Sequence, residues 1–299
     1  MLRSDQQPNG EALNIAKVLA ILKEWGYPVR LRQRFSKMNL EILSTGGGHS
    51  CYVNSHGVTS CWGSNSDGEL GTGSTQDSHL PSPVQGRLGF VTVSAGFSHS
   101  CGVTANAVAL CWGDNTSGQL GSDSGELSRL PVPVLGGIRF AAVSAGLNHS
   151  CGLATNGAAY CWGNNEYGQL GSGNKTNSIP PVPVKGEHIF TSVRAGVLFT
   201  CGITTAGSAY CWGANAQGRL GNGSTADSPV PVLVSGGLRF ASISTGDGHA
   251  CAVIANGQGY CWGDKETLKL PVLDRVYTIT EGKGITGAMC DGKPCDPFH

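Results

Sequence analysis

The stretch HSCGLATNGAAYCWGNNEYGQLGSGN, residues 149–174, decides the fold, because close copies of it recur along the chain at a step of 50 residues. The first cysteine of each copy keeps this step, at Cys51, Cys101, Cys151, Cys201 and Cys251. The second cysteine opens a Cys-Trp-Gly triplet and keeps it too, at Cys61, Cys111, Cys161, Cys211 and Cys261. A supersecondary unit copied at a fixed step predicts a repeat protein.

One unit contains three or four short strands and no convincing helix. Residues 139–146 alternate and end on a glycine, which indicates a strand. Asn156-Gly157 then joins two short apolar runs, as in a β-hairpin. The run IPPVPV, residues 179–184, predicts an edge strand or loop, because proline cannot donate a hydrogen bond to a central sheet. The sequence therefore predicts an all-β fold, a β-propeller with one blade per repeat, and a β-solenoid is the alternative.

The composition narrows the class of protein further. The 299 residues include 20 basic and 20 acidic side chains, so no net charge is available to attract nucleic acid or an anionic membrane. The hydrophobic content of 39% argues against a disordered chain. The 46 glycines do not fall at every third position, as collagen would require. No apolar run of about 18 residues is present, so we expect no membrane span.

Each predicted hairpin carries two cysteines in a Cys-x9-Cys spacing. If Thr155-Asn156-Gly157 forms a three-residue turn with a glycine bulge, Ala154 faces Ala158, and counting back by pairs places Cys151 opposite Cys161. Directly opposed strand residues are close enough for a disulfide. The same arithmetic predicts the other bridges, namely Cys51–Cys61, Cys101–Cys111, Cys201–Cys211 and Cys251–Cys261, with Cys290–Cys295 as a shrunken copy. Cysteines that all pair indicate an oxidising compartment.

Two other states of these cysteines remain open, buried reduced thiols and a zinc site. Histidines lie two residues before the first cysteine, on the same strand face, at His49, His99, His149 and His249. The fourth repeat has Phe199 at this position and still keeps both cysteines, which disfavours zinc. We therefore expect disulfides and no metal. We expect the histidines to pack in the strands and to bond to the backbone of a neighbouring blade.

The unit resembles the repeat of the regulator-of-chromosome-condensation family. That repeat has a Trp-Gly-x-Asn segment, then Gly-Gln-Leu-Gly, then a proline-valine strand. The second and third repeats match it at Gly113, Asn115, Gly118, Gln119, Leu120 and Gly121, and at Gly163, Asn165, Gly168, Gln169, Leu170 and Gly171. The first and fourth repeats carry Glu69 and Arg219 in place of the glutamine. The resemblance covers residues 41–273 and implies a propeller that has seven blades when complete.

Both ends of the chain depart from this pattern. We expect residues 1–40 to form an N-terminal extension with a short amphipathic helix. Residues 41–275 are expected to form the propeller, with repeats near 44–93, 94–143, 144–193, 194–243 and 244–275. Residues 276–299 resemble a degenerate C-terminal repeat. Five clear repeats are fewer than seven, so we expect a propeller truncated from seven blades, a gene fragment, or an atypical smaller or open propeller.

No catalytic constellation stands out, and we expect neither an enzyme nor a bound cofactor. The segment GQLGSG lies between predicted strands, so its glycines serve turns and not a phosphate loop. His-Ser-Cys recurs in successive repeats, whereas a catalytic site would occur once. We therefore expect a binding scaffold that presents a protein or glycan ligand with the loops in which the repeats differ. These loops are 72–80, 122–130, 172–179 and 222–228.

The resemblance implies two further functions. One is guanine-nucleotide exchange on a small GTPase, and the other is inhibition of an enzyme by the propeller face. The paired cysteines favour an extracellular or cell-surface location, and the cytoplasm is the alternative because no secretory signal is visible at the N-terminus. No nucleic-acid partner is expected from the balanced charge.

Overall fold

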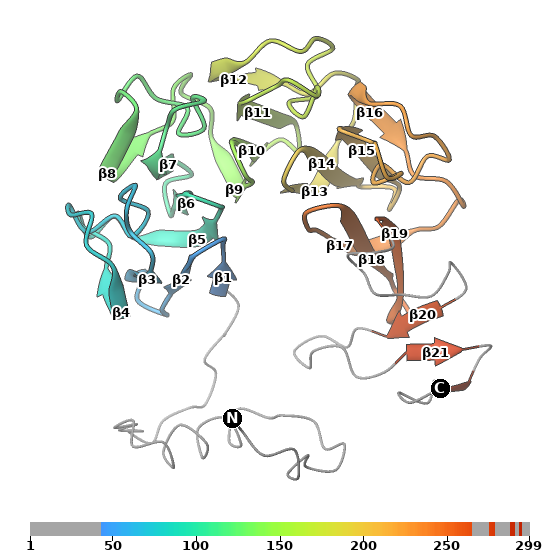
Figure 1. The fold of residues 1–299 in the computed structure, drawn as a ribbon, viewed down its shortest axis with the longest axis horizontal. Coiled ribbons are helices and arrows are strands. Elements are labelled where there is room, and N and C mark those ends of the chain that lie inside the picture. Colours follow the sequence, from blue (N-terminus) through green and yellow to red (C-terminus); the bar gives the residue numbers. More distant parts are fainter. Residues whose placement is uncertain (1–42, 265–274, 279–287, 291–292, 295–299) are drawn as a thin grey trace.

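Five antiparallel sheets follow one another around a common axis (Figure 1). The structure is a computed structural model that describes residues 43–264, 275–278, 288–290 and 293–294. Four of the sheets have four strands each, and the fifth has six. The predicted all-β propeller is confirmed, with five blades, and the β-solenoid alternative is wrong.

Each sheet follows the chain order of its strands. The first contains β1 (Leu43–Thr45), β2 (His49–Val53), β3 (Thr59–Gly63) and β4 (Ser78–Pro83). The second contains β5 (Phe90–Ala95), β6 (His99–Thr104), β7 (Ala109–Asp114) and β8 (Leu127–Pro133). The third contains β9 (Phe140–Ala145), β10 (His149–Ala154), β11 (Ala159–Gly163) and β12 (Ser178–Pro183). The fourth contains β13 (Phe190–Ala195), β14 (Phe199–Thr204), β15 (Ala209–Gly213) and β16 (Ser228–Leu233).

The fifth sheet begins with β17 (Phe240–Thr245), β18 (His249–Ile254) and β19 (Gln258–Gly263). It continues with β20 (Arg275–Thr278), β21 (Ala288–Cys290) and β22 (Lys293–Pro294). The five blades form an arc in which the first and fifth sheets occupy the two ends (Figure 1). The predicted N-terminal helix within residues 1–40 lies outside the described residues.

The strands of each blade run from the axis outward. The first strand of each blade contacts the first strand of the next, from β1 through β5, β9 and β13 to β17, around the centre of the arc (Figure 1). The proline-rich runs form the outer strands of the first four blades, β4, β8, β12 and β16. Each of these outer strands pairs with one neighbour only. Its prolines, which have no N–H group, therefore lie where a strand needs fewer hydrogen bonds than at the centre of a sheet. The predicted edge position of IPPVPV is confirmed, since residues 178–183 form β12.

The hairpin at the middle of each blade has the register that the turn residues predict. In the third blade Ala154 N donates to Ala158 O at 2.8 Å, and Cys151 lies opposite Cys161. Gly157 closes this turn with φ +84°, a left-handed conformation that costs glycine little. Ala107 occupies the same place in the second blade with φ +61°, so its Cβ meets a steric cost that the glycines avoid.

Glycine is also required after each repeated tryptophan. Gly163 has φ +102°, and a Cβ on it would lie 2.6 Å from the carbonyl oxygen of Asn148. The backbone of the turn before β10 therefore passes too close for any side chain here. This contact explains why the Cys-Trp-Gly triplet keeps its glycine in every blade.

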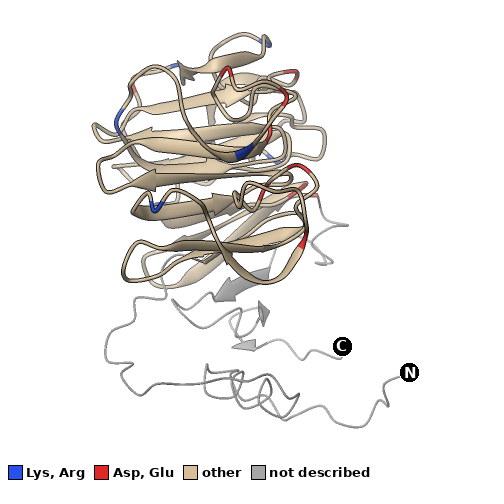
Figure 2. Cartoon of the chain, turned by 90° about the vertical axis from the view of Figure 1, so that its left-hand side faces the viewer, with Lys and Arg blue, Asp and Glu red and all other residues tan. Residues whose placement is uncertain are grey.

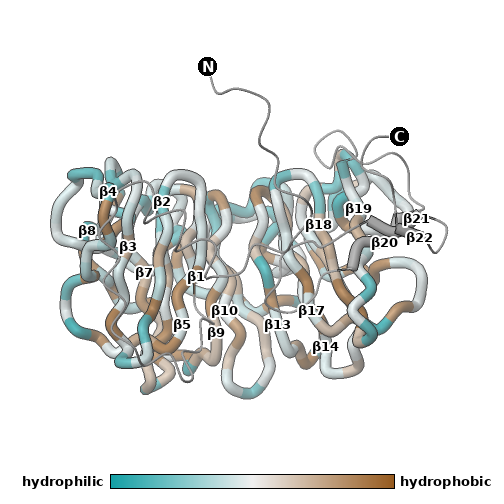
Figure 3. The backbone as a smooth tube through the Cα atoms, turned by 90° about the horizontal axis from the view of Figure 1, so that it is seen from below, coloured by the Kyte–Doolittle hydropathy of each residue, from teal (hydrophilic) through white to brown (hydrophobic). Residues whose placement is uncertain are grey.

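The hydrophobic core lies between neighbouring blades. One cluster joins Val103 and Leu120 of the second blade to Phe140 and Trp162 of the third. Trp112, Trp162 and Trp212 are fully buried, and each ring packs against the phenylalanine that begins the same blade. Hydrophobic residues concentrate along the strands and hydrophilic ones along the two edges of the propeller (Figure 3). Among the described residues, no helix could cross a membrane.

Candidate functional site: the loop rim and its support

The cysteine pairs of all five blades are disulfide-bonded in the structure. The bonds join Cys51 to Cys61, Cys101 to Cys111, Cys151 to Cys161, Cys201 to Cys211 and Cys251 to Cys261. Each bond links the middle strands of one blade across a Cα–Cα distance of 4.0 or 4.1 Å. The predicted pair Cys290–Cys295 includes Cys295, which lies outside the described residues.

The repeated histidines connect one blade to the next. Nε2 of His49 lies 2.7 Å from Ser100 Oγ, and Nε2 of His99 lies 2.8 Å from Ser150 Oγ. His149 contacts Thr200 Oγ1 in the same way at 2.9 Å. The expectation that these histidines bond to a neighbouring backbone is wrong, because their partner is a hydroxyl side chain. The hydroxyl in turn donates to a backbone carbonyl of the histidine's own blade, as Ser150 does to Gln119 O at 2.8 Å.

The junction between the fourth and fifth blades lacks both the histidine and the hydroxyl residue of this pair. Phe199 stands where the other blades have histidine, and Ala250 stands where they have serine or threonine. Both side chains are fully buried in one hydrophobic cluster. The paired replacement keeps the junction satisfied, since a histidine opposite Ala250 would leave its buried Nε2 without a hydroxyl partner.

Burial keeps the histidines of the junctions neutral. Desolvation lowers the pKa of His49 to about 4 and that of His149 to about 3. The pKa of His99 is also lowered to about 3, mainly by desolvation and further by the neighbouring His49 and His149. Their Nε2 atoms face hydroxyls of the next blade, and the adjacent cysteines are in disulfides, so these groups act in packing.

The loops between the third and fourth strands of the blades gather on one rim. Strands of a blade alternate in direction, so these loops, 64–77, 115–126, 164–177 and 214–227, lie at the opposite end of the blades from the hairpin turns. The variable segments predicted from the sequence begin and end a few residues later than these loops. Residues 78–80, 127–130, 178–179 and 228 of the predicted loops belong to the outer strands.

A buried asparagine holds each of these loops, a role that the sequence did not reveal. Asn65 Nδ2 donates to Ser74 O at 3.0 Å and to Gln76 O at 2.9 Å, and its Oδ1 accepts a bond from Leu70 N. The equivalents Asn115, Asn165 and Asn215 hold their own loops in the same way. Each asparagine Nδ2 bonds to backbone carbonyls of its loop, which leaves the loop sequence room to vary, and Asn165 and Asn215 also donate to the side chains of Asn174 and Asn222.

The charges of this near-neutral chain are divided between the two rims. The loop rim, defined here as the four loops above with the turns 46–48, 96–98, 146–148, 196–198 and 246–248, exposes mainly acidic side chains: Asp77, Asp123, Glu126, Glu166, Asp227 and Asp247. The hairpin rim, defined here as the turns between the second and third strands of the blades with the connections from one blade to the next, exposes Arg87, Arg139 and Arg239, together with the acidic Glu187. Most acidic residues accordingly lie along one edge in Figure 2. The balanced total charge hides this separation.

The chain belongs to the family of the RCC1-like domain. The model of this family matches residues 21–283, which is most of the chain. The repeat resemblance read from the sequence is therefore confirmed. A search of curated proteins finds no match.

Solved structures with the same fold are distant in sequence. Human WBSCR16 has 22% identity and a TM-score of 0.67, with 74% of this chain and 61% of that chain covered. Yeast RCC1 (Prp20), solved with bound Kap60, has 19% identity and a TM-score of 0.53, covering 75% and 70%. Prp20p from Saccharomyces cerevisiae, described with its binding to Gsp1p and histones, has 17% identity and a TM-score of 0.50. The chain thus spans about 61% of the WBSCR16 chain, and these likenesses establish the fold alone.

Proposed function

We propose that this protein is a non-enzymatic binding scaffold whose loop rim recognises another protein outside the cell. The observation that carries the proposal is the contrast between a repeating interior and a rim whose loops differ. Recurrent interactions, namely the disulfides, the buried tryptophans and the asparagine contacts, fix the backbone beneath the loops. Loops that a rigid scaffold positions are common binding elements.

The charge of the loop rim supports a protein partner over a glycan. Exposed carboxylates such as Asp123, Glu126 and Glu166 give the rim a negative field without a neighbouring basic cluster. Such a field attracts a surface rich in lysine and arginine and repels nucleic-acid phosphates. We therefore expect a partner with a basic contact surface. The five disulfides support an oxidising location, which makes the extracellular assignment preferable to the cytoplasm.

Nucleotide exchange on a small GTPase is the second candidate. It rests on the RCC1-like family and on yeast Prp20p, whose structure is described with binding to Gsp1p and histones. The disulfides disfavour a role in a reducing compartment. Inhibition of an enzyme by the propeller face is a third possibility that the same binding experiment would reveal through the identity of the partner.

The test is binding of the full oxidised chain to arrays of extracellular proteins and of glycans, in parallel with a GDP-release assay on a panel of small GTPases. We expect binding to basic proteins that weakens steeply between about 50 and 200 mM salt, and no acceleration of GDP release. Accelerated GDP release would favour the exchange-factor candidate. Salt-independent binding confined to glycans would contradict a basic protein partner.

A matched pair of variants locates the contact. The rim variant combines Asp77→Asn, Asp123→Asn, Glu126→Gln and Asp227→Asn. Asp77 Oδ1 and Asp227 Oδ1 each accept a hydrogen bond from the backbone N of the asparagine that holds their loop. In the third blade Asn177 Oδ1 accepts the same bond, so replacing these aspartates by asparagine preserves the loop. The control carries Glu187→Gln on the hairpin rim. We expect the rim variant to lose at least tenfold in affinity and the control to bind like the parent chain.

A further inference from the structure

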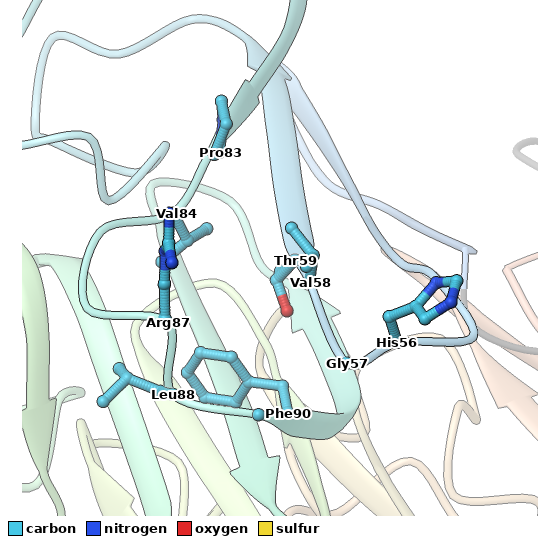
Figure 4. A pocket seen from close by; sticks show the side chains of 10 residues that line it. His56, Gly57, Val58, Thr59, Pro83, Val84, Arg87, Leu88 and Phe90 are labelled. Carbon is cyan, nitrogen blue, oxygen red and sulfur yellow. The ribbon is translucent and has the colours of Figure 1, made fainter.

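A cavity of about 460 Å³ opens on the hairpin rim, where the first blade meets the second (Figure 4). One wall is the turn between β2 and β3, with His56, Val58 and Thr59. The other wall is the connection from β4 to β5, with Arg87, Leu88 and Phe90. Cavities of this size accommodate small organic molecules, because pockets of about 300–1,000 Å³ bury most of such a ligand. It lies at the opposite end of the blades from the loop rim.

The other junctions are closed at this place by a backbone hydrogen bond. Phe140 N donates to Ala107 O at 2.9 Å, and Phe190 N and Phe240 N donate to Gly157 O and Gly207 O at 2.8 Å. The structure, which describes both Phe90 and Gly57, records no such bond between them. Two of the closed junctions also carry an arginine that reaches the turn, as Arg139 does by donating to Asn106 O at 3.1 Å. Gly89 occupies this position in the first junction, so no side chain from it covers the turn.

A buried hydroxyl without a partner lines this cavity. Thr59 is 3% exposed, and its Oγ1 makes no hydrogen bond. The equivalent positions in the next three blades hold Ala109, Ala159 and Ala209, so packing of the blade does not need a hydroxyl. Figure 4 shows the Thr59 oxygen directed toward the Phe90 side of the cavity. An unpaired buried hydroxyl is unfavourable, and a ligand atom that bonds to it would relieve this cost.

The remaining walls combine apolar surface with positive charge. Val84 and Phe90 are buried and Leu88 is half-buried, so they offer an apolar surface to a ligand. Arg87 and His56 are the titratable residues of the lining, and no carboxylate belongs to it. The Arg87 side chain makes no hydrogen bond or ion pair in the structure. Most of the exposed carboxylates lie on the loop rim, at the opposite end of the blades. A guanidinium without a partner is suited to binding a carboxylate in a bidentate manner.

We propose that this cavity binds a small carboxylate with an apolar body. The carboxylate pairs with Arg87, the apolar body contacts Leu88 and Phe90, and a polar atom of the ligand bonds to Thr59 Oγ1. This binding is separate from protein recognition at the loop rim. Failure of either proposal leaves the other unaffected.

The experiment titrates the full oxidised, ¹⁵N-labelled chain with a set of aryl and branched alkyl carboxylates and with the matching neutral amides. Phenylacetate and phenylacetamide form the first pair. We expect carboxylates to shift the amide signals of residues 56–59 and 84–90 in a saturable manner, and to bind at least fivefold more tightly than their amides. The proposal is overturned if no member of the set gives saturable shifts there, or if the amides bind as tightly as the carboxylates.

Two variants borrow residues from the other blades, so the fold tolerates them. Arg87→Gly introduces the residue found at Gly137 and Gly237 and relieves the φ of +47° at Arg87. Thr59→Ala introduces the residue of the next three blades. We expect Arg87→Gly to abolish the preference for carboxylates and Thr59→Ala to weaken carboxylates and amides alike. Lys175→Ala, which removes a positive charge from the loop rim, is the control and should leave both affinities unchanged. Equal carboxylate binding by the parent and Arg87→Gly would contradict the assignment.

Discussion

The hairpins and the loop rim belong to the same blades, but they differ in how much their residues and contacts vary from one blade to the next. The hairpins repeat the same disulfide, the same tryptophan and the same register, Cys51 opposite Cys61 and Cys151 opposite Cys161. The rim loops share their first half, with the asparagine contact and a buried leucine, and differ in the exposed segment that follows it. We therefore assign stability to the hairpins, which bury their side chains against the next blade, and the proposed recognition to the exposed segments of the loops. Changes at the junctions should therefore be costly, and changes on the loop rim should not.

Acidification should produce the largest effect, because it acts on three junctions together. His49, His99 and His149 have a lowered pKa in the folded chain, at about 4, 3 and 3. The unfolded chain, with a histidine pKa of about 6.5, binds protons first as the pH falls, so stability is complete above that pH and is lost below it. Each histidine should cost about 1 kcal/mol per pH unit between pH 6 and 5, where the unfolded chain is mostly protonated and the folded chain is not. Denaturant unfolding at pH 7.5, 6 and 5 measures this loss.

The junction of Phe199 and Ala250 supplies the control for this prediction. The double variant His149→Phe with Thr200→Ala copies that junction into the one before it. It should remain folded at pH 7.5 and lose about a third of the pH dependence, because one of three titrating groups is removed. A pH dependence equal to that of the parent chain would show that the buried histidines do not cause it.

Removing a repeated tryptophan should be the most damaging single substitution. Trp162 is fully buried, its ring centroid lies 5.8 Å from that of Phe140, and its Nε1 donates to Gln119 O at 2.8 Å. Trp162→Ala should cost about 3–5 kcal/mol, because it leaves a large cavity between two blades. Val108→Ala, at a position 44% exposed, is the control and should cost less than about 0.5 kcal/mol. Urea unfolding followed by tryptophan fluorescence compares them, and similar midpoints would refute the role of the junction.

A stabilising change is expected at one hairpin turn. Ala107 has φ +61°, whereas glycine fills the same place in the other four blades. Ala107→Gly should raise the free energy of unfolding by about 0.5–1 kcal/mol, since relief of the strain exceeds the entropy that glycine adds to the unfolded chain. Thermal unfolding measures the effect. Ala158→Gly, two residues beyond the turn's asparagine in the third blade, relieves no strain and should not stabilise.

The smallest effect is expected on the loop rim. Lys175 Nζ lies 3.4 Å from Asp227 Oδ2 and joins loops of the third and fourth blades, with side chains 51% and 31% exposed. Lys175→Ala should change stability by less than about 0.5 kcal/mol, because solvent and salt screen an exposed pair. A loss comparable to that of Trp162→Ala would mean that the rim loops hold the blades together, contrary to the division drawn above.

The repeat of Cys151 and Trp162 was sufficient to predict the blades, because residues buried at every junction recur at the blade spacing. The partner of His149 was missed, since it is Thr200, 51 residues away, and only the joint change to Phe199 and Ala250 signals the pairing. The cavity at Thr59 was missed for a related reason. It depends on two residues, Thr59 and Gly89, that differ from their equivalents in the other repeats. Their effect is visible only when the fold brings these two distant segments together.

The number of free thiols in the denatured chain, taken from the fluid or compartment in which it accumulates, tests the central claim most directly. Alkylation without reductant followed by mass spectrometry counts them, and digestion maps the bonds. We predict that the ten cysteines of the five hairpins are unreactive and that the peptides show the pairs within each blade. Ten reactive thiols would contradict a disulfide-supported propeller outside the cell and would favour a role in a reducing compartment.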